Sequence, residues 1–451
     1  MTGIESVVRP EGHREDGFGP LFERARFVDR ILLSMKSSLR WRRIAGRFLL
    51  WGAAALAPPS IASDAVLLDY TPDEVRRILQ HGPWPPPPPP ARDAGNARAV
   101  DPWAIDLGRR LFFDRRLSID GTLSCASCHV PAQAFADGRP RSLGRVGLDR
   151  NAPSLWNAVH ERWYGWDGAA DSIWSQAIRP LLDTREMAGS AAHVEAVVAG
   201  DRDLACRFER AFGRPAAGND AERTLVDVAK AIGAFVATLV SGRTPFDEFR
   251  DALAAGDRRA AARYPIDAQR GLRLFVGRGR CTTCHVGPLF THGEFGDIGL
   301  PFFVRPGQVD PGRHAGIAAL RASRFNLLSR HSDAADGDAA LKTRHVEPQH
   351  RNFGEFKVPS LRNVEETAPY MHDGQLPTLD AVLSHYVDLN LDRLHADGEQ
   401  ILQPLRVDAR ERADMVAFLK TLSDPQAHAW RAPASTDCAP RPASRGADGR
   451  R

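Results

Sequence analysis

The sequence predicts an all-α protein made of two similarly organised halves. Period-two alternation of apolar and polar residues is scarce along the 451 residues, so strands should be few and short. Several segments instead carry apolar residues at helical spacing. One order of features also occurs twice: an amphipathic helix, a glycine-containing loop and a Cys-x-x-Cys-His pentad. This repeat predicts two domains, with expected bounds of 101–255 and 256–430.

The N-terminal segment indicates export. Residues 1–34 are charged and unpatterned, and we expect a non-native upstream extension there. From Met35, MKSSLRWRR precedes the apolar run FLLWGAAALA and the small residues SIA, which is typical of a cleaved signal peptide over 35–62. A membrane anchor is the alternative, but about ten apolar residues are too few to span a bilayer. The pair Arg42 and Arg43 is weakly similar to a twin-arginine signal. We expect ordinary export, a periplasmic protein and no stable membrane insertion.

Residues 63–100 are expected to form an N-terminal arm. YTPDEVRRIL offers Thr71 as N-cap, Pro72 at the first helical position and Glu74 as capping-box partner, which predicts a short helix. PWPPPPPP, residues 83–90, favours polyproline II. A packed core cannot use that conformation, so this stretch is predicted to be a stiff linker or an arm on the surface.

Four further helices follow from apolar spacing and capping residues. Apolar positions 104, 107, 111 and 112 predict one before the first pentad, and Ala268, Leu272 and Phe275 predict its counterpart before the second. Between the pentads, residues 222–242 carry apolar side chains at 225, 228, 232, 235, 236 and 239, with Gly242 as the expected C-terminal cap. Asp408 and Glu411 have capping-box spacing before the last predicted helix. Residues 431–451 are expected to be a disordered tail.

The pentads CASCH, residues 125–129, and CTTCH, residues 281–285, have three interpretations. A four-cysteine zinc ribbon has its Cys-x-x-Cys pairs roughly 15–20 residues apart, whereas the pairs here begin at Cys125 and Cys281. Zinc also does not explain a histidine after each pair. A redox dithiol needs a strand–helix setting that neither flank provides. Cys-x-x-Cys-His is the attachment signature of c-type haem, in which two thiols bond the porphyrin and the histidine binds iron. The expected ligands are Cys125, Cys128 and His129 for one haem, and Cys281, Cys284 and His285 for the other.

The net charge and the cysteines outside the pentads limit the possible partners and cross-links. A formal charge of +4 on 451 residues is too mild to argue for nucleic acid as a partner. Cys206 and Cys438 lie outside the pentads. An oxidising compartment permits a disulfide between them, although two unpaired thiols fit the sequence equally well.

The other axial position of each iron separates an electron carrier from an enzyme. Methionine is the usual second ligand in a cytochrome c, yet after signal removal only Met187, Met371 and Met415 remain. No histidine occurs from 130 to 159, so the first iron is expected to keep an open position, which suits peroxide or oxygen chemistry.

For the second haem, a predicted helix starting after Thr378 directs Tyr386 inward and His385 about 100° away. The pattern alone favours an ordinary core tyrosine.

Longer phrases resemble the bacterial dihaem cytochrome c peroxidase family from about Leu107 to Leu422. They are LGRRLFFDRRLSIDGTLSCASCH, RNAPSLWN, YGWDGAADSIWSQAIRPLLDTREMA, CTTCH and FKVPSLRNVEETAPYMHDG. The resemblance implies two class I cytochrome c-like domains, each with one covalent haem c. It also implies Trp166 between the haems, a catalytic group over the open iron, and a calcium site of oxygen donors. The catalytic group would be Gln176, Pro180 and Glu186; the calcium donors would be the Asn151 side chain and the carbonyl oxygens of Thr367 and Pro369.

Two departures resemble the MauG branch of that family. The family's second-haem methionine falls fourteen residues after the histidine of HDG, where this chain has Tyr386. The histidine that blocks the first haem in many relatives has no counterpart in 130–159. A hard phenolate favours ferric and higher states, whereas a thioether favours ferrous iron. Tyr386 would therefore suit storage of oxidising equivalents.

Three functions remain. The first is a peroxidase that consumes hydrogen peroxide with electrons from a small cytochrome c or cupredoxin. The second is a MauG-like oxidase that modifies residues of a protein substrate, and the third and weakest is a plain dihaem electron carrier. The polar insertion at 321–345 either contacts a partner or wraps the second haem.

Overall fold

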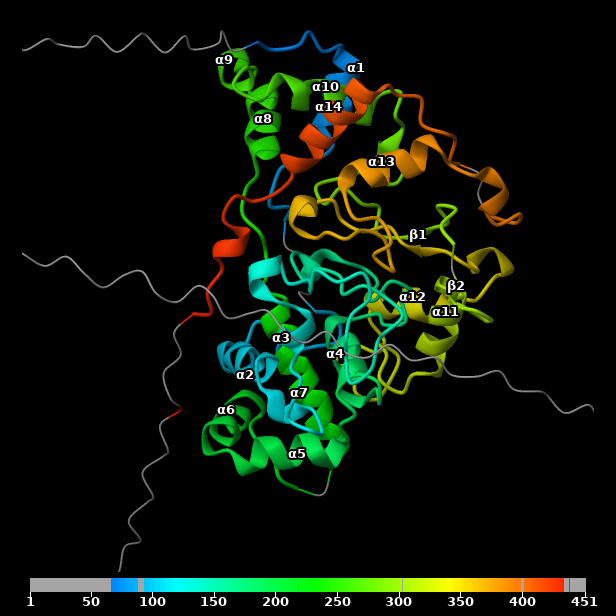
Figure 1. Cartoon of the computed structure of the whole chain (residues 1–451). Coiled ribbons are helices and arrows are strands. Elements are labelled where there is room, and N and C mark those ends of the chain that lie inside the picture. Colours follow the sequence, from blue (N-terminus) through cyan, green and yellow to red (C-terminus); the bar gives the residue numbers. More distant parts are fainter. Residues whose placement is uncertain are drawn as a thin grey trace, which may run out of the picture. The chain divides into compact units, whose positions relative to one another are not determined.

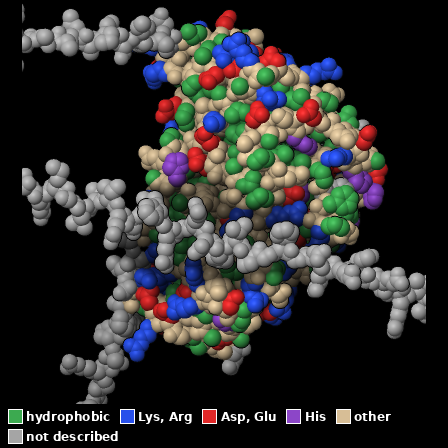
Figure 2. All heavy atoms as spheres, viewed as in Figure 1, with side chains coloured by type: hydrophobic (Ala, Val, Ile, Leu, Met, Phe, Trp, Pro, Cys, Tyr) green, Lys and Arg blue, Asp and Glu red, His purple; other side chains and the backbone are tan. Residues whose placement is uncertain are grey.

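The computed structural model describes residues 66–87, 93–218, 220–301, 303–398, 401–433 and 438. The expected upstream extension and signal peptide lie outside these residues. The described part is mostly helical with a few short strands, as predicted (Figure 1). None of its helices combines the length and apolar character needed to cross a membrane. On the face drawn in Figure 2, acidic and basic side chains are interspersed.

The first half is built around one largely buried helix, α7 (Ala221–Val236), which packs against α2, α4 and α5. Figure 1 shows these helices gathered together with α6. Gly108 of α2 allows the closest approach, since a Cβ there would lie 1.8 Å from the Ala231 carbonyl oxygen. The surrounding helices are α2 (Pro102–Phe112), α4 (Ile173–Leu182), α5 (Ala191–Gly200) and α6 (Arg202–Phe212).

The second half contains the same kind of close helix contact at a glycine. Helix α10 (Ile266–Val276) crosses α14 (Ala409–Lys420), and a Cβ at Gly271 would lie 2.0 Å from the Asp414 carbonyl oxygen. Gly108 and Gly271 occupy the corresponding helices before the two pentads, so the repeat extends to helix packing. The other helices of this half are α1 (Pro72–Leu79), α8 (Pro245–Ala254), α9 (Arg258–Ala261) and α13 (Leu379–Val387).

The remaining elements are short. Strand β1 (Phe295–Gly296) pairs antiparallel with β4 (Phe356–Lys357), and β2 (Phe303–Arg305) pairs antiparallel with β3 (Gln308–Val309). Helices α3 (Cys125–Cys128), α11 (Arg313–Ala322) and α12 (Asp338–His345) complete the α-helices, so the polar insertion contains regular structure. The 3₁₀ helices are Arg115–Leu117, Pro131–Gln133, Ala158–His160, Cys281–Thr283, His350–Asn352, Val364–Glu366, Leu391–Arg393 and Ala427–Ala429.

Capping residues correctly predicted the starts of three helices, at Thr71, Thr378 and Asp408. The capping boxes of Thr71 with Glu74 and of Asp408 with Glu411 are both present. The predicted end of α7 at Gly242 is wrong, because the helix stops at Val236. Asn157 holds the chain that follows: its backbone N–H donates to Leu239 and its side-chain oxygen accepts from the Ser241 N–H at 2.9 Å. These bonds replace the helical ones.

The two ends of the described chain pack on opposite halves. Ile78 of α1 belongs to the second-half core, which also contains Phe246, Phe275, Phe290 and Phe418. Trp84 is 3% exposed and donates to the Ser241 carbonyl, so the prediction of a surface arm or free linker is wrong at this residue. At the other end, Ala427 and Trp430 pack on the first-half core, which is defined by Leu107, Phe135, Trp174, Ile232 and Phe235.

Cys206 and Cys438 form a disulfide across 232 positions of sequence. Cys438 is buried, and its backbone N–H donates to the Asp203 carboxylate at 2.8 Å. The expectation of disorder is therefore wrong at Cys438, while residues 439–451 lie outside the described part. The bond attaches the tail to α6.

Replacing Cys206 with serine should lower the free energy of unfolding by about 2–4 kcal/mol, because the cross-link no longer restricts the unfolded chain. Denaturant unfolding of the oxidised protein measures this loss. Cys438→Ser and the double variant should lose no more than the single variant. Equal stability of Cys206→Ser and wild type would contradict a stabilising disulfide.

Candidate functional site

Both pentads hold their histidine in the same way. The Nδ1 of His129 lies 3.0 Å from the carbonyl oxygen of Phe135, and the Nδ1 of His285 lies 2.9 Å from that of Phe290. A carbonyl oxygen can only accept, so in each ring Nδ1 carries the hydrogen. Nε2 is then the nitrogen able to coordinate a metal. The two halves therefore each hold an imidazole whose Nε2 could bind a metal.

The accepting residues adopt an unusual backbone conformation in both halves. Phe135 has φ of 57° and Phe290 has φ of 54°. This left-handed region is uncommon for a bulky residue and costs on the order of 1–3 kcal/mol. The same strained turn in both halves aims a carbonyl at the histidine. Core packing alone does not require a left-handed phenylalanine at this point in both halves.

The four pentad cysteines are not disulfide-bonded, and all four are partly buried. Burial raises the pKa of Cys125 and of Cys281 to about 12 and that of Cys128 to about 11. Redox dithiols instead have lowered pKa values. Within the described residues, the one group of three possible metal ligands, His350 with His395 and Asp397, contains no cysteine. Both observations disfavour the dithiol and zinc interpretations.

A cavity of about 1120 Å³ surrounds the second pentad. Cys281, Cys284, His285 and Tyr386 all line it. Burial raises the pKa of the Tyr386 phenol, and the neighbouring thiols raise it further, which places the phenol close to both cysteines. The Nε2 of His385 instead donates to the Ile298 carbonyl at 2.8 Å, so this ring is turned away as predicted. The structure thus brings His285 and Tyr386 to one cavity large enough for a flat cofactor.

Helix α4 carries Gln176 and Pro180, two of the residues expected to be catalytic. The two residues are four apart and therefore share a helix face. The buried Oε1 of Gln176 has no hydrogen-bond partner among the described residues. Pro180 has no N–H to offer the Gln176 carbonyl. This face therefore presents an unsatisfied side-chain acceptor, which fits a surface that contacts a bound molecule.

Glu186 follows α4 and acts electrostatically on the thiols of both Cys125 and Cys128. Burial raises the pKa of Glu186 to about 7, with a further increase from Asp183. A carboxyl with a pKa near neutrality can both accept and release a proton. The structure places this group beside the first pentad.

Trp166 lies on a loop that lines the second cavity. Its indole N–H donates to the Asn151 carbonyl at 3.0 Å, and its own carbonyl accepts from the Lys357 N–H of β4 at 2.8 Å. It lines the same cavity as His285 and Tyr386. On the other side of this loop, a Cβ at Gly165 would lie 3.6 Å from the Gln176 Oε1. The loop therefore reaches from the Gln176 face to the second cavity.

The predicted calcium donors also meet at this cavity. Asn151, Thr367 and Pro369 all line it. The side-chain N–H of Asn151 donates to the Arg139 carbonyl at 2.6 Å, which leaves its Oδ1 as a possible cation donor. The Asn151 backbone N–H donates to the His372 carbonyl at 2.7 Å and joins the two segments. The oxygen donors fit the preference of calcium.

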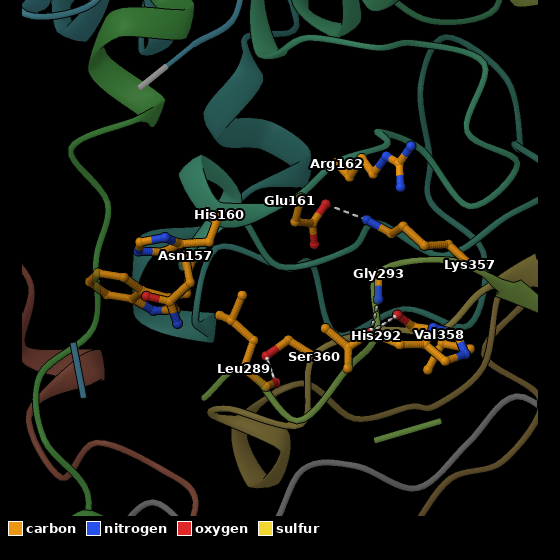
Figure 3. Close-up of a pocket in the computed structure, with 12 residues that line it drawn as sticks. Asn157, His160, Glu161, Arg162, Leu289, His292, Gly293, Lys357, Val358 and Ser360 are labelled. Atoms are coloured by element: carbon orange, nitrogen blue, oxygen red, sulfur yellow. Dashed lines mark hydrogen bonds and ion pairs between the residues drawn. The ribbon is translucent and has the colours of Figure 1, made fainter. Parts of the chain in front are cut away.

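Sequence patterns did not indicate the cleft between the halves, drawn in Figure 3. It measures about 110 Å³ and is lined by Asn157, His160, Glu161 and Lys357 among others. Lys357 is buried, pairs with the Glu161 carboxylate and donates to the Trp163 carbonyl at 3.3 Å. Lys357 belongs to the phrase FKVPSLRN, whose spacing carries no information about a partner 196 positions earlier. This pair anchors the strand that binds the Trp166 carbonyl.

The duplicated thiol–imidazole sites and the carboxyl of near-neutral pKa define a protein with two cofactor sites and a proton-transfer group. A family profile described as di-haem cytochrome c peroxidase matches residues 102–254. The methylamine utilization protein MauG of Methylorubrum extorquens is 36% identical over 328 residues, covering 72% of this chain and 80% of the relative. The cytochrome-c peroxidase IdrP1 of a Pseudomonas species is 32% identical, covering 76% of this chain and 85% of the relative.

Solved structures agree with these relatives. A MauG-like protein associated with microbial copper homeostasis superposes with a TM-score of 0.55 and 28% identity, covering 72% of this chain and 91% of that protein. The chain belongs to the di-haem cytochrome c peroxidase family, a family of oxidoreductases that carry haem c. The resemblance inferred from the sequence phrases is confirmed.

Proposed function

We propose that this chain is a periplasmic peroxidase or oxidase with one haem c in each half. Cys125, Cys128 and His129 would hold the first, and Cys281, Cys284 and His285 the second. The two class I cytochrome c-like domains were expected over 101–255 and 256–430, but α8 packs in the second core, so the boundary between them would fall before Pro245. The observation that carries this proposal is the repeated bond from Nδ1 to a phenylalanine carbonyl, which leaves Nε2 for iron in both halves.

When bound, the haem groups would supply two electrons to peroxide and would then be reduced again by one electron at a time from a donor. Glu186 accepts a proton from the attacking peroxide oxygen and returns it to the departing oxygen, as its pKa of about 7 permits. The unpaired Oε1 of Gln176 accepts a hydrogen bond from the peroxide O–H and orients it. Pro180 keeps this face free of a competing backbone donor.

Trp166 and Tyr386 distribute the oxidising equivalents. Trp166 belongs to the loop that runs from the Gln176 face to the second cavity. Its indole N–H is held by a hydrogen bond to the Asn151 carbonyl. A calcium ion on Asn151, Thr367 and Pro369 would hold this segment rigid. Tyr386 and His285 would both hold the iron of the second haem, and a hard anionic phenolate would stabilise its oxidised states.

A MauG-like oxidation of a protein substrate is the second candidate. Tyr386 at the position of the family's methionine favours it, because a stabilised oxidised state allows time for a slow protein substrate. In the first candidate, a small cytochrome c or cupredoxin supplies electrons. A plain electron carrier would not need Glu186 or the unpaired Gln176 acceptor.

The proposal is tested on protein from a host that matures c-type cytochromes. The mass should exceed that of the processed polypeptide by two haems, and Cys281→Ala with Cys284→Ala should remove one. A colourless protein of bare polypeptide mass would overturn the proposal. Peroxide is then added to the diferric protein, followed by a reduced cytochrome c. Rapid oxidation of the cytochrome supports the peroxidase, whereas a long-lived oxidised protein that ignores it supports the MauG-like activity.

The reaction with peroxide should depend on pH through Glu186. Below pH about 7 the carboxyl is protonated and cannot accept the peroxide proton, so the rate should rise as pH increases through this value and then level off. Stopped-flow measurements from pH 5 to 9 give the profile. Glu186→Gln should flatten it, and an unchanged inflection in that variant would assign the titration to another group.

A further inference from the structure

His81, a residue of the N-terminal arm, is built into the second pentad's turn. It follows α1, and its ring is completely buried. Its Nδ1 lies 3.2 Å from the Gly287 carbonyl oxygen, 206 positions along the chain. The ring stacks on Phe290 with centroids 4.5 Å apart and planes inclined by 10°. His81 therefore contacts both ends of the turn from Gly287 to Phe290.

This turn orients the axial histidine. The Gly287 carbonyl also accepts from the Phe290 N–H at 3.0 Å, which closes the turn. Phe290 is the strained residue whose carbonyl accepts from the Nδ1 of His285. A contact that holds Gly287 and Phe290 together thus fixes the direction of that carbonyl. His81, the turn and His285 are thus joined by an unbroken series of contacts.

The protonation of His81 follows from its surroundings. Burial lowers the pKa of His81 to about 4, so the ring is neutral. Its buried Nε2 has no hydrogen-bond partner among the described residues. Since the Gly287 carbonyl can only accept, the single ring hydrogen lies on Nδ1, and an unpaired lone pair remains at Nε2. The hydrogen bond to Gly287 is therefore a fixed property of the neutral ring.

Among the described residues, no histidine stacks on the Phe135 ring of the first half. The Phe135 ring instead meets the edges of Trp156 and Trp430, with centroids 5.3 Å and 5.2 Å away. Indole rings contact Phe135 at the first site, whereas an imidazole ring contacts Phe290 at the second. This difference distinguishes two otherwise repeated sites. The polar contact belongs to the half whose cavity also contains Tyr386.

We propose that His81 is a positioning residue of the second haem, holding the Gly287–Phe290 turn so that the Phe290 carbonyl keeps its hydrogen bond to His285. The proposal rests on the proposed function, because it assumes a haem at the second pentad. Such outer hydrogen bonds raise the basicity of a ligating histidine. Loosening the turn should weaken that bond and raise the reduction potential of the second haem.

The test uses three variants of the haem-loaded full-length protein. His81→Phe keeps the stacked ring but lacks the donor, and His81→Asn keeps a short N–H donor but lacks the ring. Tyr70→Phe is the matched control, since it removes another hydrogen bond from the arm to the second half, from the Tyr70 hydroxyl to the Gln269 carbonyl at 3.0 Å. Redox titration gives both potentials, and electron paramagnetic resonance gives the ferric ligand field of each haem.

We expect His81→Phe to shift the ferric–ferrous equilibrium of the second haem about tenfold toward ferrous, which is about 59 mV for one electron. The signal of the ferric second haem should change as well, while the first haem keeps its potential and spectrum. His81→Asn should recover part of the shift, and Tyr70→Phe should cause none. Two correctly attached haems with unchanged second-haem potential and spectrum in His81→Phe would overturn this inference alone. Absence of the second haem from wild-type protein would overturn the proposed function instead.

Discussion

Replacing Glu186 with glutamine is expected to slow the reaction with hydrogen peroxide by roughly 10²–10⁴-fold, the usual contribution of a positioned acid–base group. Glutamine has nearly the same shape but cannot take up the peroxide proton. The buried carboxyl has a pKa of about 7 in the folded protein, so about half of it is ready to accept a proton at neutral pH. Stopped-flow absorbance after mixing with peroxide measures the rate.

The haem spectra of this variant should stay unchanged, because Glu186 is not an iron ligand in the proposed site. Glu209→Gln is a matched control: it removes an exposed carboxylate of the same half and should leave the rate unchanged. A normal peroxide rate in Glu186→Gln would remove this residue from the mechanism.

Replacing Tyr386 with methionine should raise the reduction potential of the second haem by a few hundred millivolts, within the range of about 0.8 V that axial ligands span. A neutral thioether stabilises ferrous iron, whereas a phenolate stabilises ferric iron. The long-lived oxidised state after peroxide should shorten accordingly. Spectroelectrochemical titration of the purified protein measures the potential.

Tyr370→Phe is the control for this substitution. Tyr370 lines the same cavity, but its hydroxyl already donates to the Val364 carbonyl at 3.0 Å. Its loss should leave the potential of the second haem within error. If Tyr386→Met also leaves the spectrum and the potential as they were, the tyrosine is a packing residue.

Residues that act through nearby sequence were predictable. Thr71 and Asp408 cap their helices through side chains three positions away, and the helical period turned Tyr386 inward and His385 outward. The pentads needed only their own five residues. These features depend on backbone geometry that is the same in every protein.

Contacts between distant segments were not predictable. The end of α7 depends on Asn157, which lies about 80 positions earlier and gives no signal in the helix itself. The approach of Lys357 to Glu161 and of His81 to Gly287 likewise depends on how the halves fold back on each other. Neither apolar spacing nor local composition encodes such pairings.

The exchange of terminal segments between the two cores has a consequence for how the molecule is made. Synthesis delivers the N-terminal half first, yet its core lacks Ala427 and Trp430 until almost the whole chain has emerged. The segment around Ile78 is made early, but the second-half residues against which it packs are made later. The two cores are therefore expected to become complete at nearly the same time. Either half expressed as a separate fragment would lack core residues that the other end of the chain supplies.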